Sequence, residues 1–319
     1  MEGKLYQINY QVGYFIINQT NQQQKEIKLT KAIICINGLT GHLYNNQLFN
    51  RMTQTIQNDY LIILTQLRSS GSSFGMVTLQ NDVEDLDLIL QYLTTIIPSL
   101  NELYLLGHST GCQDIVKSLE MKLHYKYPIK KCILQAPVSD RDSMRGDKDI
   151  ENEIKRLETL YNVNLVEIVD KLNVYNSLKQ SNNSTNNSEN EENEKEIYQL
   201  KQIIESKQPS QCLYCNEYFL MQRRFISLFV RRGEDDYFSE DFTNEEFQQL
   251  FSCLTIPCLF IFSLNDQYIP QTQEEYQILI QRMKNANENI SIQQVYDDHE
   301  VSHSLDVVID MIIRFISQN

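Results

Sequence analysis

The sequence predicts an α/β protein, in which a mostly parallel sheet is covered by helices on both faces. Continuous apolar segments of strand length recur along the chain, and strands that are covered on both faces have this composition. Through the first 140 residues these segments alternate with amphipathic helical patterns. Alternation of this kind is typical of strands joined by crossover helices in a parallel sheet.

The predicted sheet strands are short runs rich in Ile, Leu, Val and Phe, namely Lys31–Asn37, Tyr60–Thr65, Glu102–Leu106, Lys131–Ala136, Ile256–Ser263 and Ile290–Tyr296. Two further segments, Leu5–Ile17 and Lys25–Leu29, flank a polar Gln/Asn stretch and predict an opening hairpin.

Helical spacing of apolar residues is clearest from Val83 to Ile97, where Pro98 closes the helix. Another helix is expected around Leu48 and Met52. The remaining core helices are expected at Gln113–Leu123, Glu274–Met283 and Leu305–Ile316.

The alternation breaks between the fourth and fifth of these strands. Residues 149–179 and 197–204 have helical patterns, and the tract at 181–194 has no apolar residue, so that it is expected to be disordered. We therefore expect one core formed by residues 1–140 and 233–319, with a helical cap inserted at 141–232.

An acidic segment, Gly233–Asp241, follows the insertion, and arginines flank it. The acids could bind a cation or a basic substrate group, and the arginines an anionic substrate. An acidic capping turn with ion pairs is the favoured interpretation. The arginines are Arg141, Arg145, Arg223 and Arg224.

Composition excludes some classes of function. The net charge is −14 with no basic stripe, which argues against a nucleic-acid partner. No apolar run approaches the roughly 18 residues of a membrane span. The seven scattered cysteines and the absence of a secretory signal favour free thiols and a cytoplasmic location.

The segment Gly107-His108-Ser109-Thr110-Gly111 has the G-x-S-x-G pattern, directly after a predicted strand and before a predicted helix. A tight strand-to-helix turn of this kind makes a serine hydroxyl protrude to where a base can reach it. The glycines on either side leave room for the strand and the helix to approach closely. Ser109 is therefore the candidate nucleophile.

A serine nucleophile needs a histidine base and a carboxylate that orients the base. In the order Ser, acid, His that is typical of α/β-hydrolases, the base is His299 or His303, in the loop after the last strand. Asp266, directly after a buried strand, is the favoured acid, and Asp140 is the alternative.

The oxyanion formed during attack needs two backbone N–H donors, which are expected from Leu39 and Thr110. Residues close to these donors are candidates for substrate contact. They are Gly38, Thr40, His42 and His108, of which His108 lies within the elbow and is expected to pack beside it.

Six segments together resemble the eukaryotic α/β-hydrolase family DUF1749 or UPF0613, which includes fungal siderophore esterases. They are Ile36–Thr40, Gly107–Asp114, Leu134–Arg141, Arg224–Leu228, Gly233–Ser239 and Ser263–Pro270. The resemblance implies Ser109 as nucleophile and Asp266 as acid. Members carry a His-x-apolar-Ser run before the last helix, which His299-Glu300-Val301-Ser302 matches better than the run at His303. The resemblance therefore favours His299 as the base, with His303 as the alternative.

The expected activity is hydrolysis of a carboxylic ester through an acyl-enzyme, with a small-molecule, siderophore-like ester as substrate and no metal or organic cofactor. An acyltransferase or a thioesterase would use the same three residues. A binding protein that retains the fold without catalysis is the alternative from another class.

Overall fold

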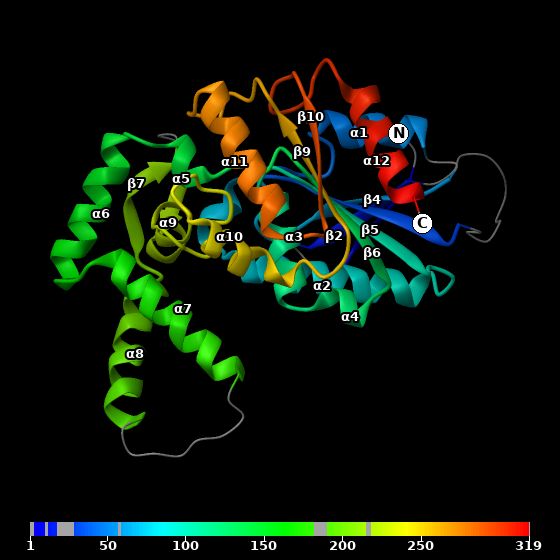
Figure 1. Ribbon diagram of the computed structural model, residues 1–319. Helices are drawn as coiled ribbons and strands as arrows, with labels where there is room; N and C mark the ends of the chain where they lie inside the picture. The colour runs from blue at the N-terminus through cyan, green and yellow to red at the C-terminus, as the bar shows by residue number, and fades with distance from the viewer. Residues whose placement is uncertain are drawn as a thin grey trace. The chain divides into compact units, whose positions relative to one another are not determined.

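The computed structural model describes residues 3–9, 12–17, 29–56, 59–181, 190–214 and 218–318. Eight strands form one sheet in the order β1-β2-β4-β3-β5-β6-β9-β10 (Figure 1). From β4 to β10 every neighbouring pair is parallel, whereas β2 is antiparallel to β1 and to β4. The strands are β1 (Gly3–Gln7), β2 (Gly13–Ile17), β3 (Lys31–Ile36), β4 (Leu61–Gln66), β5 (Glu102–His108), β6 (Ile129–Gln135), β9 (Cys258–Ser263) and β10 (Ile290–Val295).

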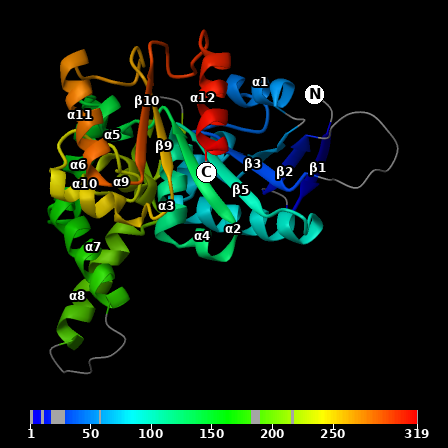
Figure 2. The ribbon, with the colours of Figure 1, turned by 45° about the vertical axis from the view of Figure 1, so that its right-hand side comes forward.

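The alternation of side chains along each strand produces two apolar layers. Ile34 and Ile36 of β3 face the layer of α2, α3, α10 and α11, whereas Ile33 and Cys35 face the layer of α1 and α12 (Figures 1 and 2). These helices are α1 (Gln47–Thr55), α2 (Leu79–Ile96), α3 (Thr110–Glu120), α10 (Asn244–Leu250), α11 (Gln273–Ala286) and α12 (Leu305–Ser317), with the short α4 (Leu123–Lys126) after α3.

The predicted mostly parallel sheet with helices on both faces is confirmed. Among the described helices, none is both long and apolar enough to cross a membrane. Two 3₁₀ turns, η1 (Gly71–Met76) and η2 (Phe251–Cys253), complete the connections.

The opening hairpin differs from the expectation, because the chain turns inside the segment that was predicted as one strand. β1 pairs with β2 from Gly3 opposite Ile17 to Gln7 opposite Gly13. The Asn9 side chain accepts a hydrogen bond of 2.8 Å from the Val12 N–H, which is how asparagine stabilises a turn. Residues 25–28 of the second predicted strand lie outside the described residues.

A second compact unit consists of Asp140–Asp236 together with Gly75–Thr78, so that the chain leaves the first unit after Ser139 and returns at Tyr237. Its helices are α5 (Asp140–Ser143), α6 (Lys148–Tyr161), α7 (Leu165–Ser181), α8 (Asn190–Ile204) and α9 (Gln222–Phe229). It also contains an antiparallel hairpin, β7 (Pro209–Tyr214) and β8 (Tyr218–Met221), which the helical pattern did not predict. Most of the low-complexity tract, residues 182–189, lies outside the described residues.

Ion pairs anchor Asp235 and Asp236, the last two residues of this unit. The Arg224 side chain is fully buried, and its Nη1 lies 2.7 Å from both carboxylate oxygens of Asp235. Arg141 Nε lies 3.0 Å from Asp236 Oδ2. The interpretation of the acidic segment as an ion-paired turn is confirmed for Asp235 and Asp236.

We expect Asp235→Asn to destabilise the inserted unit by about 3–5 kcal/mol, because it leaves the buried Arg224 charge without its carboxylate. Denaturant unfolding followed by circular dichroism measures this, since the chain has no tryptophan. Glu196→Gln is the control, because the exposed pair of Glu196 with Lys171 is worth at most about 1 kcal/mol. Equal small losses in the two variants would contradict the structural role of the Arg224 pair.

Candidate active site

Ser109 occupies a strained turn between a strand and a helix. β5 ends at His108 and α3 begins at Thr110, and the Ser109 backbone has φ 55° and ψ −124°. Non-glycine residues rarely adopt positive φ, and such strain is concentrated at functional sites. The Ser109 N–H donates to the Gln135 carbonyl at 3.0 Å, which anchors the turn to the end of β6.

The two glycines of the pattern are required by space. A Cβ on Gly107 would lie 2.2 Å from the Gly111 carbonyl oxygen, and a Cβ on Gly111 would lie 2.4 Å from the Ile36 carbonyl oxygen. Both obstructing atoms belong to the backbone and cannot rotate away. The prediction that these glycines allow close approach of strand and helix is therefore confirmed.

The loop after β3 packs directly against the serine. A Cβ on Gly38 would lie 2.6 Å from Ser109 Cβ and 3.2 Å from its Oγ. The loop is a turn closed by the Gly41 N–H donating to the Gly38 carbonyl at 3.0 Å, with Thr40 at φ 60°. Leu39 directly follows the glycine that packs on Ser109, whereas its role and that of Thr110 as oxyanion donors stay predictions.

His299 and Asp266 form a buried hydrogen-bonded pair. His299 Nδ1 lies 2.6 Å from Asp266 Oδ2, and the side chains are only 4% and 0% exposed. The other carboxylate oxygen accepts a bond of 2.9 Å from the Tyr268 N–H, and the Tyr268 ring meets the His299 ring edge-on at 4.8 Å. With Nδ1 donating to the carboxylate, Nε2 is the proton-accepting nitrogen of the neutral ring.

Gln135 links this pair to the serine turn. Its backbone carbonyl accepts from the Ser109 N–H, while its side-chain Nε2 donates to the His299 carbonyl at 3.1 Å. The His108 ring lies 4.8 Å from the His299 ring. The ends of β5, β6, β9 and β10 thus bring a strained serine and a histidine–aspartate pair to one edge of the sheet.

The alternative base and acid lie in other environments. His303 is 86% exposed, and its Nδ1 bonds to Asp297 Oδ1 at 3.0 Å. Asp140 is buried in the inserted unit, where loss of hydration and the nearby Asp235 raise its pKa to about 7. A triad acid must be ionised to stabilise an imidazolium, and the raised pKa opposes this at neutral pH. The geometry favours His299 with Asp266.

His42 is exposed, and its backbone braces the loop after β3. Its N–H donates to the Asn45 side chain at 2.9 Å and its carbonyl accepts from the Asn37 side chain at 3.2 Å. Among the described residues, no hydrogen bond joins the His42 ring to His299 or Asp266. Its role in substrate contact stays a prediction.

Among the described residues, Asp297, Asp298 and His303 bring three metal-ligand atoms within 4.8 Å of one another. Asp297 Oδ1 and Oδ2 accept bonds from the His303 ring and from the His303 N–H. Asp298 Oδ1 accepts from the Ser302 N–H at 3.0 Å. These bonds brace the loop that carries His299, which accounts for the cluster.

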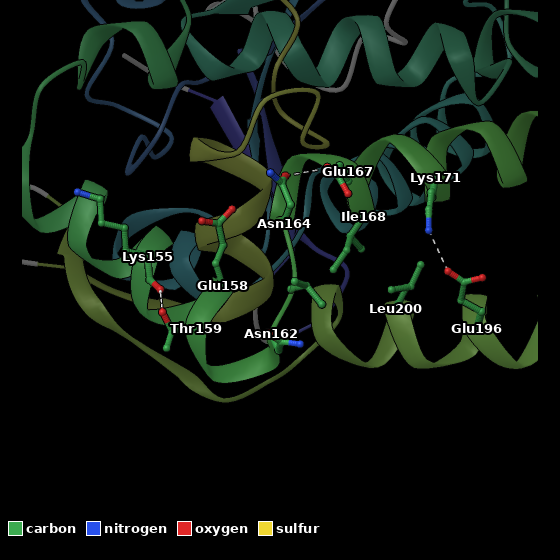
Figure 3. Close-up of a pocket in the computed structure, with 11 residues that line it drawn as sticks. Lys155, Glu158, Thr159, Asn162, Asn164, Glu167, Ile168, Lys171, Glu196 and Leu200 are labelled. Carbon is green, nitrogen blue, oxygen red and sulfur yellow. Dashed lines mark hydrogen bonds and ion pairs between the residues drawn. The ribbon is translucent and has the colours of Figure 1, made fainter.

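The inserted unit has a hollow of about 770 Å³ between α6, α7 and α8 (Figure 3). Its lining is charged and amide-rich, with Lys171 paired to Glu196 across it. The residues that line it include no serine, cysteine or histidine. This hollow therefore lacks the serine or cysteine and the histidine of a nucleophile–base pair like the one at the sheet edge.

Sequence reasoning missed three residues of this edge: Gln135, Tyr268 and Glu300, whose carboxylate lies 3.1 Å from His108 Nε2. For Gln135 a signal existed, because it is a polar residue at the end of an apolar strand. Tyr268 and Glu300 lie in loops, where periodicity carries no information.

The sheet order, the strained serine after β5 and the acid and histidine after β9 and β10 define an α/β-hydrolase fold. The chain belongs to the DUF1749 family, a "protein of unknown function" family whose model matches residues 8–316. A UPF0613 protein of Schizosaccharomyces pombe is 28% identical over 139 residues, which span 41% of this chain and 43% of that relative.

Solved structures share the fold over nearly the whole chain. The siderophore hydrolase EstB from Aspergillus fumigatus is similar with a TM-score of 0.64 at 19% identity, covering 99% of this chain and 98% of that one. Est1E from Butyrivibrio proteoclasticus, solved with ferulic acid bound, has a TM-score of 0.56 at 12% identity, covering 96% and 94%. The predicted family and fold are confirmed.

The contact of His303 with Asp297 can be tested through the pKa of His303. The hydrogen bond that the His303 ring donates to the Asp297 carboxylate raises the pKa of His303 above its ordinary value. We expect Asp297→Asn to lower it, because the neutral amide no longer stabilises the imidazolium. An NMR titration of the His303 ring protons measures the shift, with Asp310→Asn as control. A His303 pKa that stays raised in Asp297→Asn would contradict the observed pairing.

Proposed function

We propose that the protein is a serine hydrolase that cleaves carboxylic esters through an acyl-enzyme. The observation that carries the proposal is the buried His299–Asp266 pair at the sheet edge where the strained Ser109 lies. The two are tied together through Gln135 and through the contact of the His108 and His299 rings. Nucleophile, base and acid on one edge are what acyl transfer requires.

In the proposed reaction, Ser109 Oγ attacks the ester carbonyl and His299 Nε2 accepts the hydroxyl proton. The N–H groups of Leu39 and Thr110 stabilise the oxyanion, and the packing of Gly38 on Ser109 supports the placement of Leu39. Collapse of the tetrahedral intermediate breaks the ester C–O bond, and the alcohol leaves with the proton from His299. Water then attacks the acyl group as His299 Nε2 accepts its proton. The bond between Ser109 Oγ and the acyl carbon breaks, the carboxylic acid leaves, and His299 returns the proton to Ser109. Asp266 stabilises the imidazolium in both halves of the reaction.

The proposed substrate is a small-molecule carboxylic ester. Proteins of the same fold support this class, since EstB is a siderophore hydrolase and Est1E binds ferulic acid. Within the class we propose a siderophore-like ester. We further propose that the insertion at 141–232 acts as a cap that selects the substrate, since insertions of this kind vary substrate preference while the core keeps its chemistry.

We expect Ser109→Ala to lower the turnover of an activated ester such as p-nitrophenyl acetate by about 10⁴-fold or more, because no other group forms the acyl-enzyme. His299→Ala should lose activity to a similar extent, since the hydroxyl then has no base. Steady-state kinetics at fixed pH measure both losses.

His303→Ala is the matched control, because it removes a histidine four residues from His299 that contacts Asp297 instead of Asp266. We expect its turnover to stay within about threefold of the wild type. Near-normal hydrolysis by Ser109→Ala would eliminate the mechanism. A large loss in His303→Ala with a small loss in His299→Ala would exchange the two histidines.

A further inference from the structure

A second histidine–carboxylate contact lies beside the first. His108 is buried, with Nδ1 2.5 Å from Gln135 Oε1 and Nε2 3.1 Å from Glu300 Oε1. His108 directly precedes Ser109, and Glu300 directly follows His299. The contact between His108 and Glu300 therefore joins the residue before Ser109 to the residue after His299.

Hydrogen-bond partners occupy both nitrogens of the His108 ring. Gln135 donates from Nε2 to the His299 carbonyl, so its amide oxygen faces His108 Nδ1. His108 Nε2 lies against the Glu300 carboxylate, and this hydrogen bond lowers the pKa of the Glu300 carboxyl. Gln135 and Glu300 therefore fix the orientation of the His108 ring at both of its nitrogens.

We infer that Glu300 and His108 form a second histidine–carboxylate pair, and that this pair positions His299 for proton transfer. The inference rests on the proposed function of His299. The pair acts through the His108 ring, which lies 4.8 Å from the His299 ring at 57°, and through the backbone of the loop that carries both His299 and Glu300.

The loop needs such a restraint because it is strained. Val301 is buried with φ 50°, a conformation that is a genuine outlier for a β-branched residue and costs of order 1–3 kcal/mol. Glu300 is held by His108 and the His299 carbonyl by Gln135, on the side of the loop that faces the sheet edge. The pair thus fixes the backbone from which the His299 ring extends.

Glu300→Gln tests the inference, because it keeps the shape of the side chain and removes its charge. We expect kcat to fall by about 10–100-fold while KM changes by less than about threefold, since the base is misplaced and the substrate contacts are kept. Glu288→Gln makes the same change at an exposed position and should leave kcat and KM unchanged. A Glu300→Gln variant with wild-type kcat would overturn the inference.

A double-mutant cycle with His108→Gln separates the pair from two independent structural roles. If the two residues act as one unit, the double variant loses no more activity than the worse single variant. Losses that multiply in the double variant would overturn the inference. Thermal unfolding of each variant, followed by circular dichroism, controls for loss of folded protein.

Nitrogen-15 NMR of the His299 ring provides a readout that does not depend on activity. We expect the His299 ring signals to shift in Glu300→Gln, because the pair no longer holds the ring in place, and to stay unchanged in Glu288→Gln. Unchanged His299 signals in Glu300→Gln would overturn the inference even in an active enzyme. Signals that shift as expected in a protein that hydrolyses no ester would instead overturn the proposed function.

Discussion

The backbone of Ser109 is the constraint around which the candidate catalytic edge is built. Its positive φ costs of order 1–3 kcal/mol and is maintained by packing that leaves no alternative: Gly107 lies against Gly111, and Gly111 lies against the end of β3. Because the serine is positioned by backbone atoms, the loop at Gly38 and the carbonyl of Gln135 meet it at defined places. The candidate nucleophile is therefore held by the backbone of the sheet itself.

Strain recurs along the same edge. Thr40, Ser109, Ala136 and Val301 all have positive φ, and they follow β3, β5, β6 and β10 at their carboxyl ends. These turns redirect the chain sharply where strands end, so that side chains from four strands converge. The hydrogen bonds of Gln135, Asp297 and Glu300 hold the loop after β10 in a conformation that valine does not favour by itself.

Local patterns predicted the parts of the molecule that depend on local sequence. The sheet strands appeared as apolar runs, and the pattern around Ser109 indicated the turn because glycine is required at both flanks. Residue patterns alone could not choose between His299 and His303, because the difference lies in a contact of His299 with Asp266, which is 33 residues away in the chain. The resemblance to a family supplied that preference.

Contacts between residues far apart in the chain were the second feature that the sequence did not predict. The bond between His108 and Glu300 joins residues 192 apart in the chain, and neither has a spacing that indicates the other. The hairpin of β7 and β8 was missed because β8 has only four residues and because Pro209–Tyr214, with its Pro, Ser and Gln, resembles a loop in composition.

Labelling with a fluorophosphonate, followed by mass spectrometry of the digested protein, tests the central claim most directly. Such a probe reacts with a serine only when a base activates it, so it reports the geometry at Ser109 without knowledge of the substrate. The account predicts one adduct per chain, on the peptide that carries Ser109, and none after heat denaturation. Folded protein that stays unlabelled, or an adduct on another serine, would contradict it.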